Sequence, residues 1–257
     1  MSDALSPIKK AIEERLAARG GESFAVFDFD NTCIINDVGE ATFAYLCGHE
    51  LLRDRTLLGE KDESDGYHER VFRTYHTLLT EKKMRAAYIL CGRMFSGFSP
   101  GEAEAAALAA ITEEGSRIGS KMLYDVHIER GLSPRPVVLA LMVFLREKGV
   151  AIWIVSASAE PSVRAAMQHF GIKGELVGVR SVLKNKVFTS ELEEPMSIME
   201  GKAECIKKYI DNAKEPLLVA GDSMNDLPML EMAEIQVVVD RGNELAKIAR
   251  EREWFLL

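Results

Sequence analysis

Two kinds of apolar pattern divide this chain. Short apolar runs occur at residues 24–27 and 150–155, and each is too short for a helix. Runs of this length near glycine indicate buried β-strands. Between them, residues 28–149 place apolar side chains at helical spacing over several segments. The pattern therefore predicts a first strand, a long all-helical insertion and then a return to strands.

The helical spacing also predicts a helix before the first strand, at Asp3–Arg19. Leu5, Ile8, Ile12 and Leu16 form one face of this helix, and we expect that face to cover the core. Further helices are expected at residues 41–52, 67–79, 81–95, 101–111 and 133–148. We expect the inserted helices to form a separate cap domain at residues 37–129. The core domain then comprises residues 1–36 and 130–257, with the N-terminal helix inside residues 1–20.

From residue 150 onward, strands and helices alternate. Strands are expected at 150–155, 176–179, 187–189, 217–220 and 235–239, and helices at 161–170, 202–210, 227–233 and 245–251. This alternation predicts an α/β fold, a doubly wound parallel sheet with helices on both faces. Ligands of such sheets bind beyond the carboxyl ends of the strands. Functional residues should therefore lie just after each strand.

The composition narrows the class of protein. The 257 residues carry a formal net charge of −8, which argues against a nucleic-acid partner. No apolar run approaches the ~18–20 residues that a membrane helix needs, and Met1–Lys10 lacks the apolar stretch of a signal peptide. The four cysteines form no C-x-x-C pair, so we expect them to be reduced and buried. We expect a cytoplasmic protein that binds neither nucleic acid nor membrane, and the sequence does not determine its oligomeric state.

Asp28, Asp30 and Thr32 directly follow the first predicted strand. Two carboxylates at positions i and i+2 of an extended chain point the same way, and they repel each other unless a cation or a metal-bound phosphoryl group lies between them. The alternative is a solvated turn with a helix cap. A calcium loop is not expected, because Cys33 stands where such a loop needs glycine and Gly39 where it needs glutamate.

Two single polar residues follow further along the chain. Ser156 comes after the strand at 150–155 and just before a helix, where a hydroxyl can hold a phosphate oxygen; plain capping of the helix is the alternative. Lys202 opens a helix, where the helix dipole favours anions over cations. Its position suggests a role such as neutralising a phosphoryl group, although an ordinary surface lysine fits the same pattern.

Asp222, Asn225 and Asp226 follow the strand at 217–220. Two carboxylates and an amide after a buried strand again indicate a site for a metal and a phosphate, with a capped turn as the alternative. All four polar clusters lie, in order, at or beside the carboxyl edge of one predicted sheet. A shared site is therefore favoured over four separate turns.

The four clusters together resemble the motifs of the haloacid dehalogenase-like hydrolase superfamily. In chain order, the motifs match Asp28, Asp30 and Thr32, then Ser156, then Lys202, then Asp222, Asn225 and Asp226. The resemblance covers residues 23–38 and 132–239. The insertion after the first motif is similar to the cap of the group that contains the phosphoserine and the phosphocholine or phosphoethanolamine phosphatases. It implies a Rossmann-like core with an inserted α-helical cap.

The resemblance implies a phosphatase that acts on a small-molecule phosphate ester with Mg²⁺ as its cofactor. Asp28 would attack phosphorus to form an aspartyl phosphate, and Asp30 would protonate the leaving alcohol and later deprotonate water. Members that cleave carbon–halogen bonds lack an aspartate at the position of Asp30, so dehalogenation is not expected. Asp28, Asp222 and the carbonyl oxygen of Asp30 would bind Mg²⁺.

The resemblance also assigns residues that would bind the phosphoryl group, namely Thr32, Ser156, Ala157, Lys202 and Asn225. Asp226 would hold Lys202 or the loop of Asp222. The same residues would serve a phosphotransferase that passes the group to an acceptor alcohol. A non-catalytic binding protein on this fold is the third hypothesis, and the intact motifs argue against it.

Asp37 and Glu40 are the candidates for recognising the leaving group. In the phosphoserine and phosphocholine groups, an acidic residue near the place of Asp37 contacts the ammonium of the substrate, although acids at a solvated helix start fit the pattern as well. An aromatic cage is a weaker hypothesis, because a helical cap needs aromatic residues for its own core. Phosphoserine phosphatases follow the second-motif serine with two glycines and a phenylalanine, whereas this chain continues with Ala157-Ser158-Ala159. That departure favours phosphoethanolamine or phosphocholine over phosphoserine.

Overall fold

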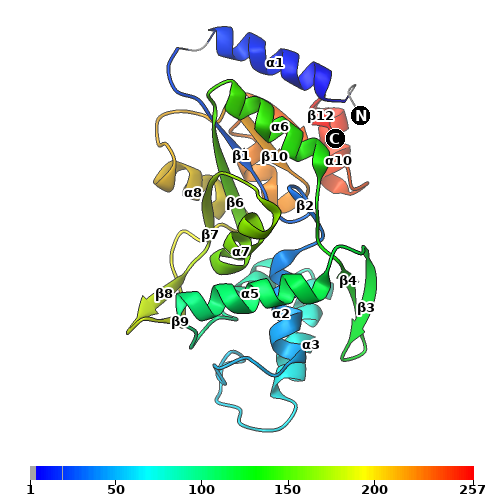
Figure 1. The fold of residues 1–257 in the computed structure, drawn as a ribbon, viewed down its shortest axis with the longest axis vertical. Helices are drawn as coiled ribbons and strands as arrows, with labels where there is room; N and C mark the ends of the chain where they lie inside the picture. The colour runs from blue at the N-terminus through cyan, green and yellow to red at the C-terminus, as the bar shows by residue number, and fades with distance from the viewer. Residues whose placement is uncertain (1–3, 19) are drawn as a thin grey trace.

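A parallel β-sheet lies at the centre of the computed structural model, which describes residues 4–18 and 20–257 (Figure 1). Its strands are β1 (Phe24–Phe27), β6 (Ala151–Ala159), β7 (Glu175–Val179), β10 (Leu218–Gly221), β11 (Ile235–Val238) and β12 (Phe255–Leu256). The strand order is β12-β11-β10-β1-β6-β7, and each neighbouring pair is parallel. The carboxyl ends of these strands therefore lie along one edge of the sheet.

Helices cover both faces of the sheet, because the side chains of each strand alternate between the faces. In β1, Ala25 and Phe27 pack into one hydrophobic cluster, whereas Phe24 and Val26 pack into another. The first cluster includes residues of α1 (Leu5–Ala18), α6 (Pro136–Glu147) and α7 (Glu160–Phe170), and the second includes residues of α8 (Glu200–Tyr209), α9 (Leu227–Leu230) and α10 (Glu244–Glu251). The predicted α/β fold class is confirmed.

The N-terminal helix α1 lies against α6, and it buries Leu5, Ile8 and Ile12 (Figure 1). Its apolar face is therefore the face that meets the core. The predicted ends of this helix, Asp3 and Arg19, lie outside the described residues.

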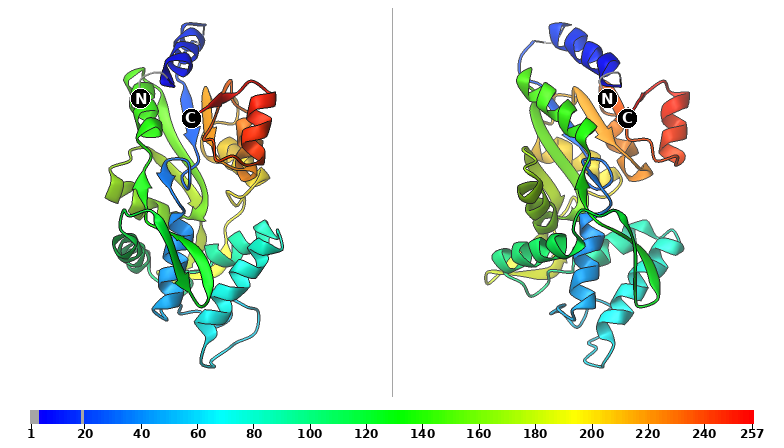
Figure 2. Two further views of the ribbon diagram at one scale, coloured as in Figure 1. Left: turned by 90° about the vertical axis from the view of Figure 1, so that its right-hand side faces the viewer. Right: turned by 45° about the vertical axis from the view of Figure 1, so that its right-hand side comes forward.

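The segment between β1 and α6 forms a second layer beyond the carboxyl ends of the strands (Figures 1 and 2). It contains α2 (Val38–Gly48), α3 (Tyr67–Thr80), α4 (Met84–Gly92), α5 (Pro100–Glu114) and an antiparallel hairpin of β3 (Gly119–Leu123) and β4 (Val126–Arg130). The insertion is thus not entirely helical, in contrast to the expectation from its apolar spacing. Tyr124 and Asp125 turn the hairpin with positive φ angles, and this residue pair lacks the glycine that normally reveals such a turn in a sequence.

Two further antiparallel pairs lie beside the main sheet. β8 (Ser181–Lys184) pairs with β9 (Val187–Leu192), so the strand predicted near residue 187 does not join the parallel sheet. β2 (Ile34–Ile35) pairs with β5 (Ser133–Pro134), and this pair brings the beginning and the end of the insertion together.

The helical layer packs on the sheet layer through one continuous hydrophobic cluster. Phe43 of the insertion belongs to the same cluster as Phe27 of the sheet. The backbone of β9 adds two hydrogen bonds, because Gly97 N–H donates to the Phe188 carbonyl and Phe188 N–H donates to the Phe98 carbonyl, each at 2.8 Å. These contacts hold the insertion over the carboxyl ends of the strands.

The structure also bears on the expectations of buried, reduced cysteines and of a chain without a membrane helix. All four cysteines are buried and free, as expected. Across residues 4–18 and 20–257, the structure contains no helix that combines the length and the apolar character needed to cross a membrane.

Candidate active site

The chain reverses direction directly after β1. Asp28 follows the last residue of the strand, and its N–H donates to the carbonyl of Ala220 in β10 at 2.9 Å. Asn31 and Asn36 then adopt left-handed φ angles of 60° and 65°, which asparagine tolerates better than most residues. The N–H of Asn31 donates to the carbonyl of Asn36 at 3.0 Å and closes the loop. This compact loop presents Asp28 and Asp30 at the carboxyl edge of the sheet.

Asp28 is a buried carboxylate with a partner on each oxygen. Its Oδ1 accepts a hydrogen bond from Lys202 Nζ at 2.6 Å, and its Oδ2 accepts one from the Thr32 hydroxyl at 3.0 Å. Burial raises the pKa of Asp28 well above its usual 3.8, the charges of Asp226 and Asp222 raise it further, and Lys202 lowers it. The carboxylate is therefore held in one orientation, and Lys202 is the group that favours its ionised form.

Lys202 is completely enclosed, and its Nζ also donates to Asp226 Oδ1 at 2.5 Å. Burial acts to lower the pKa of this amine, but the carboxylates of Asp226 and Asp28 outweigh burial and raise the pKa above its usual value. The interpretation of Lys202 as an ordinary surface lysine is therefore excluded.

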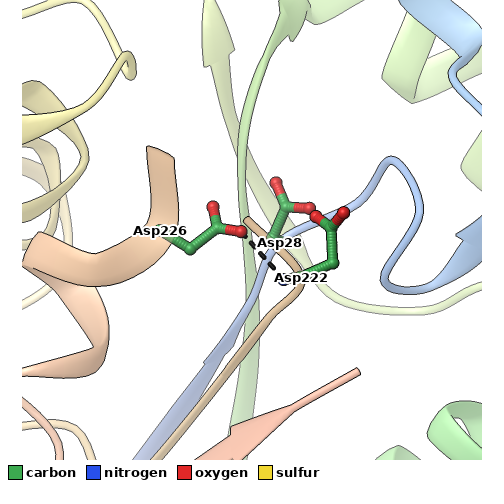
Figure 3. A group of neighbouring side chains, drawn as sticks. All are labelled: Asp28, Asp222 and Asp226. Carbon is green, nitrogen blue, oxygen red and sulfur yellow. Dashed lines mark hydrogen bonds between the residues drawn. The ribbon is translucent and has the colours of Figure 1, made fainter. Parts of the chain in front are cut away.

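Asp28 and Asp222 follow the neighbouring strands β1 and β10, and Asp226 approaches them from the short 3₁₀ helix η1 (Met224–Asp226) (Figure 3). One oxygen atom from each lies within 4.8 Å of the others. Asp226 already uses both of its oxygens, because Oδ1 binds the enclosed lysine and Oδ2 accepts from the N–H groups of Asp222 and Ser223 at 2.9 and 3.1 Å. Gly221 makes room for this contact, since a Cβ there would lie 2.8 Å from Asp226 Oδ2.

Asp28 and Asp222 remain as the pair of carboxylates that fits a divalent cation. The Thr32 hydroxyl lies 3.0 Å from Asp28 Oδ2 and 3.5 Å from Asp222 Oδ1, so one oxygen of each acid faces the same region. Burial raises the pKa of Asp222 to about 6, and the charge of Asp226 adds to this effect while Arg241 opposes it. Neighbouring buried acids with raised pKa values are stabilised by a cation, and carboxylate oxygens are the ligands that Mg²⁺ prefers.

Asp30 lies apart from this group of carboxylates. Its Oδ1 accepts a hydrogen bond from Val38 N–H at 2.7 Å, and its Oδ2 accepts from the hydroxyls of Ser158 and Ser156 at 2.7 and 3.2 Å. Burial raises the pKa of Asp30 well above its usual 3.8, and the charges of neighbouring aspartates raise it further. The hydrogen bonds from Ser158 and Val38 oppose this shift, but burial and the neighbouring charges outweigh them, so the carboxyl group favours its protonated form and can act as an acid.

Residues 25–231 match the sequence profile of the haloacid dehalogenase-like hydrolases. The chain belongs to this family. A phosphorylcholine phosphatase from Pseudomonas aeruginosa is 29% identical in an alignment that covers 83% of this chain and 71% of that protein.

Solved structures of this hydrolase fold resemble the chain along most of its length. A conserved protein of unknown function from Anaerococcus prevotii has a TM-score of 0.72 at 21% identity, over 97% of this chain and 91% of that chain. A phosphoserine phosphatase, solved as an analogue of its phospho-aspartyl intermediate, has a TM-score of 0.55 at 15% identity, over 92% and 93%. At these identities the likeness concerns the fold.

In this haloacid dehalogenase-like hydrolase, the motif residues surround a cavity of about 100 Å³, which we call the acidic chamber. Its lining residues are Asp28, Asp30, Asn31, Asp37, Tyr88, Ala157, Asp222, Ser223, Asn225 and Arg241. The chamber therefore brings the predicted nucleophile, the predicted acid and the predicted metal ligands to one cavity.

Four other predicted residues are buried beside the chamber and do not line it, namely Thr32, Ser156, Lys202 and Asp226. Thr32 and Lys202 bind Asp28, as described above. The Ser156 hydroxyl donates to Asp30 and does not cap α7, whose N-cap is Ala159. The structure thus brings these residues to the site as partners of the chamber carboxylates.

The two candidates for recognising the leaving group have different surroundings. Asp37 caps α2, where its Oδ1 accepts from Glu40 N–H at 2.8 Å, and it also lines the acidic chamber. Burial raises the pKa of Asp37. Glu40 does not line the chamber, since its side chain lies toward the helical layer, with Oε1 3.5 Å from His76 Nε2 in α3. Burial raises the pKa of Glu40 to about 8. Asp37 is thus both a helix-start residue and a wall of the chamber.

The analysis of strand ends and motifs did not single out five residues at the site, namely Asn31, Ser223, Arg241, Ser158 and Tyr88. Arg241 lines the chamber and donates from Nη1 to Asp222 Oδ2 at 2.9 Å; it follows β11, so extending the search to that strand end would have found it. Ser158 binds Asp30 because it stands two positions after the motif serine in an extended strand. Tyr88 comes from α4, and no local pattern distinguishes it from the aromatic residues of the helical core.

Proposed function

We propose that this hydrolase is a Mg²⁺-dependent phosphatase that cleaves a small-molecule phosphate monoester through an aspartyl phosphate on Asp28. The observation that carries the proposal is the setting of Asp28. It is buried, it is held on both oxygens by Lys202 and Thr32, and it opens into the acidic chamber. A carboxylate oriented in this way is suited to act as a nucleophile.

In the first half-reaction, an oxygen of Asp28 attacks phosphorus, and the bond between phosphorus and the ester oxygen breaks. Asp30 gives its proton to that oxygen, so the leaving group departs as a neutral alcohol. The raised pKa of Asp30, caused mainly by burial, supports the presence of this proton. The products are the aspartyl phosphate and an ionised Asp30.

In the second half-reaction, the oxygen of a water molecule attacks phosphorus, and the bond from phosphorus to Asp28 breaks. Asp30 accepts a proton from that water, so inorganic phosphate leaves and both aspartates return to their first state. The hydrogen bonds from Val38 N–H and the Ser158 hydroxyl, each at 2.7 Å, hold the Asp30 carboxyl group in place during both steps.

The residues of the chamber also fit a Mg²⁺ ion. Asp28, Asp222 and the carbonyl oxygen of Asp30 would hold the ion, whereas both oxygens of Asp226 are engaged elsewhere. When bound, Mg²⁺ offsets the repulsion between the carboxylate nucleophile and the phosphoryl group.

We assign the binding of phosphoryl oxygens first to Asn225 and the backbone of Ala157, which line the chamber. Lys202, Thr32 and Ser156 lie behind the chamber carboxylates, and we propose that they turn from Asp28 and Asp30 to a phosphoryl oxygen when the substrate binds. Asn225 is prepared for this role, because its Oδ1 accepts from Met199 N–H at 2.6 Å. That contact leaves the amide NH₂ group of Asn225, which is a donor, for a phosphoryl oxygen.

We further propose that residues 37–129 act as a cap over a core of residues 1–36 and 130–257. Asp37 and Tyr88 support this division, because the insertion supplies both of them to the wall of the acidic chamber. A wall of this kind limits the access of bulk water while the aspartyl phosphate forms. The same wall contacts the leaving group.

The proposed leaving group carries an amine, as in phosphorylcholine or phosphoethanolamine. Asp37 supports this choice, since its half-buried carboxyl group lines the chamber and would be stabilised in its ionised form by a cation. The similarity to a phosphorylcholine phosphatase agrees with it. We assign the contact to Asp37 because Glu40 faces His76 in the helical layer.

A screen of phosphate esters with Mg²⁺, combined with Asp28→Asn, tests the proposal. We expect the wild type to release phosphate from phosphorylcholine or phosphoethanolamine, and rapidly quenched protein to carry one phosphoryl group on Asp28. Asp28→Asn should lose turnover and labelling but keep its fold, because the amide has the same shape and is not a nucleophile. Asp125→Asn is the matched control, since the Asp125 side chain is 90% exposed on the β3–β4 hairpin.

Two outcomes of this screen would contradict the proposal, namely no phosphate release from any ester, and phosphoryl labelling that persists in Asp28→Asn. Adding glycerol as an acceptor separates hydrolysis from phosphoryl transfer. A hydrolase releases free phosphate in its presence, whereas a phosphotransferase accumulates glycerol phosphate.

A further inference from the structure

A second cavity, of about 240 Å³, adjoins the acidic chamber. Its lining residues are Met84, Tyr88, Met199, Ser223, Met224 and Asn225, and we call it the methionine pocket. Tyr88, Ser223 and Asn225 line both cavities, so the methionine pocket and the chamber share a wall.

The two volumes indicate what each cavity can hold. The methionine pocket is more than twice as large as the acidic chamber, at about 240 Å³ against about 100 Å³. A leaving group that extends from the chamber past the shared residues Tyr88, Ser223 and Asn225 therefore enters the methionine pocket.

The lining of the pocket indicates which chemistry it favours. Met84 begins α4, Met199 precedes α8, and Met224 begins the short 3₁₀ helix η1 (Met224–Asp226) after β10. Thioether side chains adapt to irregular apolar shapes, and Tyr88 adds an aromatic ring. The remaining lining residues are neutral. A pocket of this composition favours hydrocarbon over charged or strongly polar groups.

The backbone of Met199 provides a second, independent observation. Its φ and ψ angles are 51° and −122°, a region that residues with a Cβ rarely adopt. The Met199 N–H donates to Asn225 Oδ1 at 2.6 Å, and this bond connects the methionine pocket to a residue of the acidic chamber. Strained backbone that the surrounding structure maintains is found preferentially at functional sites.

We propose that the methionine pocket is a substrate subsite that binds an alkyl group of the leaving group while the phosphoryl group occupies the acidic chamber. The inference rests on the proposed phosphatase function. It adds a second preference for the leaving group, because Asp37 favours a cationic group and the methionine pocket favours an alkyl group. The preferred substrates are therefore esters whose leaving group carries an alkyl chain or alkyl substituents.

Binding of n-alkylphosphonates tests the subsite without requiring catalysis. Methyl-, ethyl-, butyl- and hexylphosphonate would be titrated by calorimetry into wild-type protein with Mg²⁺. We expect the affinity to rise about two- to fourfold for each added methylene, because each one leaves water for an apolar surface. Hydrolysis of the corresponding alkyl phosphates would be measured in parallel as kcat/KM.

Met84→Gln places a polar group of similar length in the pocket. We expect this variant to reduce the rise in phosphonate affinity to less than about 1.5-fold per methylene. Met224→Gln should act in the same direction, and because Met224 is 37% exposed it is the safer variant for folding. Met122→Gln is the matched control, since Met122 is 52% exposed on β3 and should keep the wild-type gradient.

Wild-type affinities that do not rise with chain length, or the absence of any phosphonate binding, would overturn the subsite. A gradient that survives in both Met84→Gln and Met224→Gln would also overturn it. If the phosphonates show the expected gradient but no phosphate ester is hydrolysed, the subsite stands and the proposed phosphatase function fails.

Discussion

At the scale of single residues, the charges around Asp28 depend on shared partners. Lys202 binds both Asp28 and Asp226, and Arg241 binds Asp222 at 2.9 Å. Lys202 and Asp226 are completely enclosed, and removing one partner from a buried ion pair typically costs about 3–5 kcal/mol, because the other charge stays buried and uncompensated. The Arg241 side chain is 36% exposed, so solvent screens its pair with Asp222 and the cost there is smaller. Lys202 and Asp226 therefore serve the fold as well as the proposed chemistry. Variants that test the chemistry should preserve shape, as aspartate to asparagine does.

Asp30→Asn tests the proposed proton transfer. The amide keeps an oxygen for the N–H of Val38, but it has no proton to give at a useful pKa. We expect single-turnover formation of the aspartyl phosphate from an alkyl phosphate to slow by about 10²–10⁴. With p-nitrophenyl phosphate the loss should be smaller, since nitrophenolate departs without protonation. Equal losses with the two esters would contradict the role of Asp30 as the acid.

Asp37→Asn tests how the leaving group is recognised. Asparagine is as good a helix cap as aspartate, so the start of α2 should stay intact while the charge is lost. We expect the preference for phosphorylcholine over glycerol phosphate, measured as the ratio of kcat/KM values, to fall by about 1–3 kcal/mol. Glu40→Gln should leave this preference unchanged. If Asp37→Asn also leaves it unchanged, Asp37 is a helix cap and not a specificity residue.

At the scale of elements, the start of α2 connects the chemistry to the helical layer. The first helical residue, Val38, donates its N–H to Asp30, and the preceding residue, Asp37, lines the acidic chamber. Gly39 lets the helix approach β6, since a Cβ there would lie 2.3 Å from Ser158 Oγ. A displacement of α2 would therefore move the proposed acid and the proposed specificity residue together.

Glu40, in the first turn of α2, should make the stability of the protein depend on pH. Burial raises the pKa of Glu40 from its usual 4.5 to about 8, and the charges of Asp37 and Glu129 add to this effect. The folded protein therefore holds this proton more tightly than the unfolded chain, so stability falls as pH rises from 4.5 to about 8. A pKa shift of this size changes the free energy of unfolding by at most about 5 kcal/mol. Because 19% of the Glu40 side chain is exposed to solvent, we expect a change of about 1–3 kcal/mol.

Glu40→Gln carries the neutral group at every pH and should remove this dependence. The variant should match the wild type near pH 5 and should exceed its free energy of unfolding by about 1–3 kcal/mol near pH 8. Urea denaturation at the two pH values measures the difference, with Glu60→Gln as a control on the exposed surface. A wild type and a Glu40→Gln variant with the same pH dependence would show that Glu40 is ionised in the folded protein.

At the scale of the whole molecule, the two layers enclose buried acids that a divalent cation would stabilise. Mg²⁺ at 100 times its dissociation constant should increase the free energy of unfolding by about 2.7 kcal/mol, since the unfolded chain has no such site. For a protein of this size, that increase corresponds to a rise in Tm of about 5–10 °C. Thermal unfolding with MgCl₂ and with EDTA measures the shift.

Asp222→Asn should lose most of this stabilisation, because it removes one of the two carboxylates that fit the ion. The exposed control Asp125→Asn should retain it. A rise in Tm of the same size in Asp222→Asn would place the bound ion elsewhere in the molecule.

The fold was largely predictable because apolar periodicity is a local property of the chain. The runs at 24–27 and 150–155 and the alternation after them predicted the parallel sheet, and the strand ends located Asp28 and Asp222 at its carboxyl edge. The hairpin at residues 119–130 was not predictable in the same way. Its turn has positive φ angles without the glycine or asparagine that usually reveals them.

The sequence by itself determined which residues are candidates for the chemistry, and the tertiary structure decided which of them meet. Thr32 reaches Asp222 across 190 residues of sequence, and Arg241 binds the same carboxylate from a different strand end. Such partners depend on how sheet and helices pack, and a local window contains no information about them. Asp37 was the first candidate in the sequence and Glu40 the second. In the structure, Asp37 has an extended backbone with φ −119° and ψ 115°, whereas Glu40 is already helical, so one side chain lines the acidic chamber and the other approaches the helical layer.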